Sequence, residues 1–212
     1  LVLACDRLGV KPLYWQDDGR RVCFGSELKA LAAAGGIEPR VEVCALADYL
    51  AFGHVAVPRT IWAGVYRLEP GHLAVCREGG TQVRRYWEIP PCESGEAGPG
   101  AADRAAEAFA GLFEDAVRLR RAADVPLGAL LSGGLDSACV VAGMTRTGGA
   151  NVLTHTAGFG EALFDERPAA RATARRLGTD HREVLIRPDI AETAARLAWH
   201  FDEPFADASA VP

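Results

Sequence analysis

The sequence predicts two parts of different fold class, an α+β part followed by an α/β part built on a doubly wound parallel sheet. Short apolar stretches separated by turn residues fill the first 90 residues, which is typical of a mixed α+β domain. From residue 125 onward apolar strands alternate with helical patterns, as in a parallel sheet covered by helices. Residues 91–102 between them are rich in proline, glycine and acidic residues and predict a linker. The predicted domains are therefore 1–90 and 103–212.

The first part is predicted to contain short strands and two helices. One helix is expected to begin with Ser26 as its N-cap and to end at the Gly35-Gly36 pair, and a second is expected over 43–52. The predicted strands, each an apolar or alternating run, cover residues 1–5, 22–24, 61–65, 72–77 and 83–88. Such a set is too irregular for a βαβ series and supports the α+β class.

The second part is predicted to open with a long helix over 103–123, whose apolar residues recur on one face. Strands are then expected at 125–131, 151–159 and 181–185, and helices at 136–146, 166–177 and 188–200. In a sheet of this kind ligands bind at the carboxyl ends of the strands.

The turn between the first strand and helix of this series predicts a nucleotide site. It reads Ser-Gly-Gly-Leu-Asp-Ser over 132–137. Gly133 and Gly134 lack β-carbons and let a ligand approach the main chain closely. Amides at a helix start have no intrahelical partner and face anions favourably, so they and the hydroxyls of Ser132 and Ser137 are suited to hold phosphate oxygens.

Asp136 adds a carboxylate to this turn, which suits a helix cap or a magnesium ion that bridges to phosphates. A P-loop is excluded, because no lysine follows the glycines. The pattern Ser-Gly-Gly-x-Asp-Ser resembles the pyrophosphate loop of ATP pyrophosphatases, which split ATP to AMP and pyrophosphate. An ordinary glycine-rich turn would be the default for two glycines alone, but the two serines and the aspartate favour the site.

Composition and net charge indicate which kinds of binding partner and which cellular location to expect. The chain is 49% hydrophobic and 24% charged, as in a globular protein, and its net charge of −5 argues against nucleic-acid binding. No apolar run reaches the roughly 18 to 20 residues of a membrane span. The cysteines are scattered without a Cys-x-x-Cys pair, so neither zinc nor a disulfide framework is predicted and a cytoplasmic location is expected.

Eight further segments resemble glutamine-hydrolysing asparagine synthetases, in the same order along the chain. The segments of the first part are 6–14, 24–31, 59–65 and 68–72, and those of the second are 156–159, 164–166, 177–181 and 202–207. The resemblance implies an Ntn-hydrolase-like glutaminase, incomplete, followed by an ATP-pyrophosphatase (adenine nucleotide α-hydrolase-like) domain, also incomplete. Ala138 departs from the family pattern, in which many members carry a further serine there.

The resemblance also implies an activity. It is the ATP-dependent amidation of a carboxylate, aspartate to asparagine, with ammonia from glutamine, through an acyl-adenylate and with release of AMP and pyrophosphate. The implied cofactors are ATP and Mg²⁺, the partners are the small-molecule substrates, and a homodimer is compatible with it. Two alternatives stay open: an amidotransferase acting on a polysaccharide, peptide or secondary metabolite, and a non-catalytic protein that binds adenine nucleotides.

Site residues follow from the same resemblance. Asp6 matches an aspartate that contacts the glutamine substrate, and Leu131 and Ala157 match positions that flank the adenosine. The family's nucleophile is an N-terminal cysteine, which Cys5 cannot be because it is internal, so upstream residues beginning Met-Cys-Gly are expected. The carboxylates of Asp202, Glu203 and Asp207 have two interpretations: they face the magnesium or shape the pocket, or they form a helix C-terminal turn fixed by Pro204.

Overall fold

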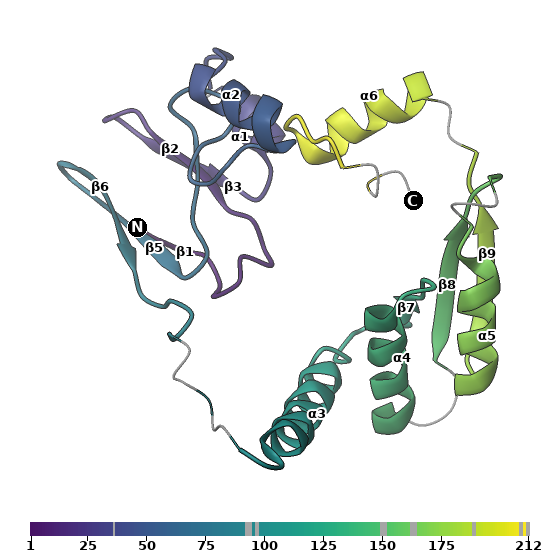
Figure 1. Ribbon diagram of the computed structural model, residues 1–212. Coiled ribbons are helices and arrows are strands. Elements are labelled where there is room, and N and C mark those ends of the chain that lie inside the picture. Colours follow the sequence, from purple (N-terminus) through teal and green to yellow (C-terminus); the bar gives the residue numbers. More distant parts are fainter. Residues whose placement is uncertain are drawn as a thin grey trace. The chain divides into compact units, whose positions relative to one another are not determined.

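The computed structural model describes residues 1–35, 37–91, 95, 98–148, 152–161, 165–187, 190–207 and 210 (Figure 1). The chain divides into two compact units, one of Leu1–Cys92 with Asp189–Val211 and one of Glu93–Pro188 with Pro212. The change of unit after Cys92 falls within the predicted linker. Residues 189–211, grouped with the second part in the sequence, pack in the first unit. The predicted element ends at Gly36, Asn151 and Pro188 lie outside the described residues.

The first unit contains two three-stranded antiparallel sheets. One has the order β1-β5-β6 and the other β3-β2-β4. The strands are β1 (Val2–Ala4), β2 (Tyr14–Asp17), β3 (Val22–Gly25), β4 (Tyr66–Arg67), β5 (His72–Arg77) and β6 (Gly80–Arg85), and the helices are α1 (Leu28–Ala33), α2 (Val43–Phe52) and α6 (Ile190–Phe201). The α+β class predicted for this part is therefore observed.

Two local predictions in this unit are wrong, for identifiable reasons. The strand expected at 61–65 is an irregular turn, closed by the Thr60 hydroxyl, which donates to the carbonyls of Trp62 (3.1 Å) and Val65 (3.0 Å). The N-cap of α1 is Glu27 and not Ser26, and the Glu27 side chain makes no cap hydrogen bond. Instead the Lys29 amide in the first turn donates to the Asp202 carboxylate at 3.2 Å.

The cores of the first unit are small and lie on either side of β2. One cluster packs β1 against β5, and the other packs α1 against β2 and the turn before β4. The first consists of Leu3, Cys5, Leu68, Ala74 and Cys76, and the second of Tyr14, Leu28, Leu31 and Val65. Cys5 and Cys76 are buried thiols, in agreement with a structural role for them.

The second unit contains one parallel sheet of order β7-β8-β9. Its elements are α3 (Ala101–Leu119), β7 (Gly128–Leu130), α4 (Leu135–Gly148), β8 (Leu153–Gly158), α5 (Arg167–Leu177) and β9 (Asp180–Leu185). Strand and helix alternate as predicted. In the described part of the chain all neighbours of β7 lie on one side, so the reversal of strand order that defines a doubly wound sheet is not seen.

The core of this unit joins α3, α4 and α5 to the sheet. It consists of Val117, Leu131, Val141, Met144, Val152, Ala170 and Ala174. None of the described helices has the length and apolarity that crossing a membrane requires.

Gly71 connects the turn at Asp6 to the end of β6. Its amide donates to the Asp6 carbonyl at 2.9 Å, and its carbonyl accepts from the amides of Tyr86 and Trp87. Its φ is +69°, and an added β-carbon would overlap the Trp87 carbonyl oxygen.

We predict that Gly71→Ala lowers the stability of the protein by about 2 to 4 kcal/mol, because it combines left-handed backbone strain with a main-chain overlap. Gly19→Ala is the control, since Gly19 has φ +79° but open space around its α-carbon. It should cost only about 1 to 2 kcal/mol of strain. Thermal or denaturant unfolding measures both, and equal losses would contradict the overlap.

Candidate functional site

Leu131 fixes the point at which the chain leaves the parallel sheet. Its amide donates to the His155 carbonyl at 2.8 Å, and its carbonyl accepts a hydrogen bond from the Thr156 hydroxyl. Its side chain is 1% exposed and belongs to the core. Leu131, which matches a position that flanks the adenosine, could therefore reach a ligand only through its main chain.

The turn at 132–137 is held in shape by its two serines. The hydroxyls of Ser132 and Ser137 lie 2.8 Å apart and bond to each other, and the Ser137 hydroxyl also accepts from the Ser132 amide at 3.1 Å. The Gly134 amide donates to the Ser132 hydroxyl at 3.1 Å. Each hydroxyl can accept two hydrogen bonds and donate one, so a phosphate oxygen could share this network.

Glu166 is a neighbour of the turn that the sequence analysis did not single out. It is the N-cap residue of α5, but its side chain does not cap that helix and instead accepts from the Gly133 amide at 3.2 Å. A β-carbon on Gly133 would lie 3.2 Å from the β-carbon of Ala169, so a glycine lets α5 pack this closely. The segment 164–166 was the available signal, although Phe164 lies outside the described residues.

Asp136 lies in the first turn of α4, and its side chain is exposed. A carboxylate is favourable there because of the helix dipole. The described residues contain no group of three His, Cys, Asp or Glu side chains that could enclose a metal ion. Magnesium in nucleotide sites commonly takes one or two carboxylates together with phosphate oxygens and water, so Asp136 fits that kind of ligand set.

Ala157 lies in β8, on the strand next to the one that ends in the turn. The register pairs Leu130 with His155, so Leu131 and Ala157 reach the same edge of the sheet. Ala157 is half-buried. A largely apolar cavity of about 530 Å³ runs along β7 and α4 and reaches Ser137. The register thus places Ala157 and the start of the loop at the same edge of the sheet, whereas Ala157 does not line this cavity.

Asp6 organises its own turn in the first unit. Its carboxylate accepts from the amides of Leu8, Val10 and Lys11, each at 3.1 Å. These hydrogen bonds, those of Lys11 and Val10 first, lower the pKa of the Asp6 carboxyl. Two carboxylate oxygens offer about four acceptor positions, so one is left to bind an ammonium group.

Asp202 and Glu203, which follow α6, contact residues 1–92 within the first unit. Asp202 has φ +60° and its amide closes the helix end on the Ala198 carbonyl at 3.1 Å, so this residue lies in a helix C-terminal turn. Its side chain pairs with Lys29 at 3.0 Å. The Glu203 carboxylate accepts from the Ile61 amide at 2.8 Å. Both side chains therefore have defined partners in residues 1–92.

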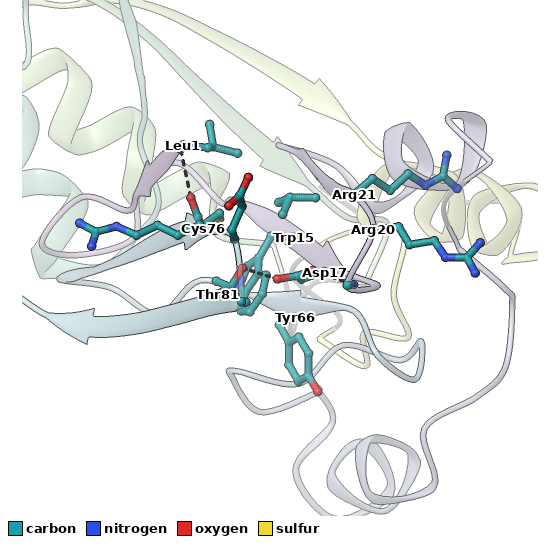
Figure 2. Close-up of a pocket in the computed structure, with 14 residues that line it drawn as sticks. Leu1, Trp15, Asp17, Arg20, Arg21, Tyr66, Cys76 and Thr81 are labelled. Carbon is teal, nitrogen blue, oxygen red and sulfur yellow. Dashed lines mark hydrogen bonds between the residues drawn. The ribbon is translucent and has the colours of Figure 1, made fainter.

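A cavity of about 940 Å³ lies beside β2 and the β5–β6 hairpin. Figure 2 shows Trp15, Asp17 and Thr81 at its centre and Arg20 and Arg21 extending away from them. The Thr81 hydroxyl donates to Asp17 at 2.6 Å and lowers the pKa of that carboxyl. This contact links β6 to β2, which is a structural role. No predicted site residue lines the cavity, so we place the candidate site at 131–137.

Comparison with protein families defines the class of the chain. Residues 1–87 match the family described as a glutamine amidotransferase domain, and residues 108–212 match the family described as asparagine synthase. The chain thus joins segments that match two different families. Together with the relatives below, the matches show that it belongs to the glutamine-hydrolysing asparagine synthetase family.

Named relatives agree with this assignment. Asparagine synthetase [glutamine-hydrolyzing] 1 of Bacillus subtilis is 31% identical over 99% of the chain and 32% of its own length. Asparagine synthetase [glutamine-hydrolyzing] 3 of the same organism is 35% identical over 67% of the chain and 23% of its own length. Amidase chry2 of Gibberella zeae is 30% identical over 98% of the chain and 33% of its own length. The chain therefore spans about a third or less of these relatives.

The pH dependence of stability follows from Glu203. Burial is the largest cause of its raised pKa, and it outweighs the hydrogen bond from Ile61 and the charge of Arg67, which act in the opposite direction. A carboxyl whose pKa is higher in the folded state stabilises the fold below its unfolded pKa, and this contribution is lost as pH rises through the folded value.

We therefore predict that Glu203→Gln gains stability relative to the parent as pH rises from about 4 to about 7. A carboxyl group with a raised pKa loses its proton within this pH range. The amide keeps an oxygen for Ile61. Glu183→Gln is the opposite control, because its hydrogen bonds from Arg171 lower the Glu183 pKa. Its deficit should grow with pH. Parallel pH profiles of parent and Glu203→Gln in thermal unfolding would refute the assignment.

Proposed function

We propose that this protein uses ATP to amidate a carboxylate, aspartate being the proposed acceptor, with ammonia derived from glutamine. The observation that carries the proposal is the serine-tied turn at 132–137, at the carboxyl end of β7 and the start of α4. The amidotransferase match over residues 1–87 supports a source of ammonia in the same chain.

In this proposal the turn holds the β and γ phosphates. The amides at the start of α4, with the serine hydroxyls, donate to phosphate oxygens. The amides of Gly133 and Gly134 join them when they leave the Glu166 carboxylate and the Ser132 hydroxyl. Magnesium held by Asp136 would neutralise charge on the departing pyrophosphate. With those phosphates bound, the α-phosphorus stays accessible to the acceptor carboxylate. The carboxylate attacks it, releases pyrophosphate and forms an acyl-adenylate. Ammonia then attacks the acyl carbon, and AMP is the leaving group.

Asp6 is proposed to bind the ammonium group of glutamine. Its carboxylate is held by three main-chain amides and keeps its charge, because those hydrogen bonds lower its pKa. A fixed anion next to a turn is suited to an ammonium ligand. Asp6 would thus combine the ligand contact that the resemblance implies with a structural role at the centre of its turn.

A second candidate keeps the chemistry and changes the acceptor. The relative from Gibberella zeae is named an amidase, and it is nearly as similar to this chain as the asparagine synthetase 1 of Bacillus subtilis. A secondary metabolite, a peptide or a polysaccharide with a free carboxylate is therefore a rival to aspartate. Assaying amide formation with aspartate and with such carboxylates separates the two.

We predict that Asp136→Asn reduces amide synthesis by at least about a hundredfold, the scale on which one electrostatic contact to a reacting group acts. Glutamine hydrolysis should persist, because Asp136 lies outside residues 1–87. Asp103→Asn is the matched control, since Asp103 also lies in the first turn of a helix, α3. Product formation at the parental rate in Asp136→Asn would remove this residue from the mechanism.

We also predict that ATP is converted to AMP and pyrophosphate. The reason is that the turn lacks the lysine of a P-loop and would hold the two terminal phosphates as a unit. Chromatography of the spent nucleotide measures this directly. ADP as the product would contradict the pyrophosphatase assignment.

A further inference from the structure

Residues 199–206, here called the docking segment, belong to one family match and contact the region of the other. They lie in the stretch that matches asparagine synthase, 108–212. In the structure they pack in the first unit, with residues that match the glutamine amidotransferase domain. Figure 1 shows the end of α6 beside α1.

Lys29 is the main partner of the docking segment. Its ammonium lies 3.0 Å from one oxygen of Asp202, and its amide donates to the other oxygen at 3.2 Å. The Asp202 side chain is 9% exposed and that of Lys29 is 23% exposed. The same ammonium lies 5.2 Å from the centre of the Trp199 ring. One residue of α1 therefore receives a charge pair, a main-chain hydrogen bond and a cation–π contact.

Two more main-chain hydrogen bonds extend the contact beyond α1. The Glu203 carboxylate accepts from the Ile61 amide at 2.8 Å, and the Ala206 amide donates to the Gly53 carbonyl at 2.9 Å. An added β-carbon on Gly53 would lie 3.4 Å from that of Ala206, so the two backbones approach closely. The docking segment is thus bound at three places: α1, the end of α2 and the turn before β4.

Asp202 holds this position at a conformational cost. It is the one described residue other than glycine with positive φ, at +60°. Such strain persists only where surrounding contacts over-determine it, and it concentrates at functional positions. The helix end alone would be served by a glycine, so the aspartate is explained by what its carboxylate binds.

A cavity of about 630 Å³ lies against the docking segment. Its lining includes Lys11 and Pro12 from the turn that Asp6 organises, Tyr14 and Arg67 from the β3-β2-β4 sheet, and Asp202 and Glu203. The docking segment therefore forms one wall of a space that begins at the proposed glutamine-binding turn.

We propose that Asp202 and Glu203 are positioning residues that couple glutamine hydrolysis to amide formation, by docking residues 199–206 on the amidotransferase part. The inference rests on the proposed function. Ammonia is useful to the synthetase reaction only if it is not lost to water, so the wall of the cavity must stay in place while glutamine is hydrolysed. The three anchoring points keep it there.

The test uses the full-length protein and two activities. Glutamate and amide product are measured with glutamine as nitrogen source, and amide product is measured separately with ammonium chloride. Lys29→Met and Asp202→Gly each remove the charge pair, and the glycine also relieves the backbone strain. We expect docking to weaken by at least about tenfold, the usual effect of losing a charge-assisted hydrogen bond. The ratio of glutamate to amide should rise, while synthesis from ammonium chloride persists.

Glu203 offers a matched pair of variants. Glu203→Leu leaves the Ile61 amide without an acceptor and should also raise the ratio, whereas Glu203→Gln keeps an acceptor oxygen and should stay near the parent. Arg171→Met is the control for loss of an ion pair elsewhere, because Arg171 binds Glu183 at 2.6 Å within the second unit. It should leave the ratio unchanged.

Two results would overturn the inference. The first is a parental ratio of glutamate to amide in Lys29→Met, Asp202→Gly and Glu203→Leu. The second is a loss of both activities together in all three variants, which would make the segment purely structural. Failure of the proposed function gives a different result. In that case the parent itself forms no amide from either nitrogen source.

Discussion

The two hydrogen bonds of the Leu131 main chain are the constraint on which the candidate site depends. They join the carboxyl end of β7 to the middle of β8, and the buried Leu131 side chain anchors the same residue in the core. The next residue, Ser132, therefore leaves the sheet at a fixed place and in a fixed direction. The loop needs only five further residues to reach Ser137, whose hydroxyl closes it. A loop of this length can be rigid because its origin is rigid.

This part of the molecule could be predicted from the sequence because its determinants are local. Two glycines, two serines and an aspartate between an apolar strand and a helix specify a turn at a sheet edge without reference to distant residues. Even here the direction of the Leu131 side chain could not be predicted, and the structure places it in the core. Glu166 was also not singled out: segment 164–166 marked its position, but its contact with the Gly133 amide 33 residues earlier could not be predicted from local sequence.

The contacts of Asp202 and Glu203 could not be predicted, because their partners are more than 140 residues away in the sequence. The same separation in sequence explains why Ser26 was wrongly predicted as the N-cap of α1. Helix capping rules search for an acceptor next to the helix, whereas the acceptor for the Lys29 amide comes from the end of α6. The strand expected at 61–65 had suitable residues, but the Thr60 hydroxyl donates a hydrogen bond to the Val65 carbonyl. That carbonyl is therefore satisfied locally and not by a neighbouring strand.

These cases share one physical device, a polar side chain that bonds main-chain groups outside regular structure. Asp6 binds three amides, Ser132 and Ser137 close their loop, and Asp202 and Glu203 fix the docking segment. The strands here contain two to six residues, so ladders alone satisfy little of the backbone. The residues with the chemistry suited to ligands are therefore also residues that shape loops. Truncating one of them disturbs both roles, whereas Asn and Gln keep the acceptor oxygen and remove only the charge, which separates structure from chemistry.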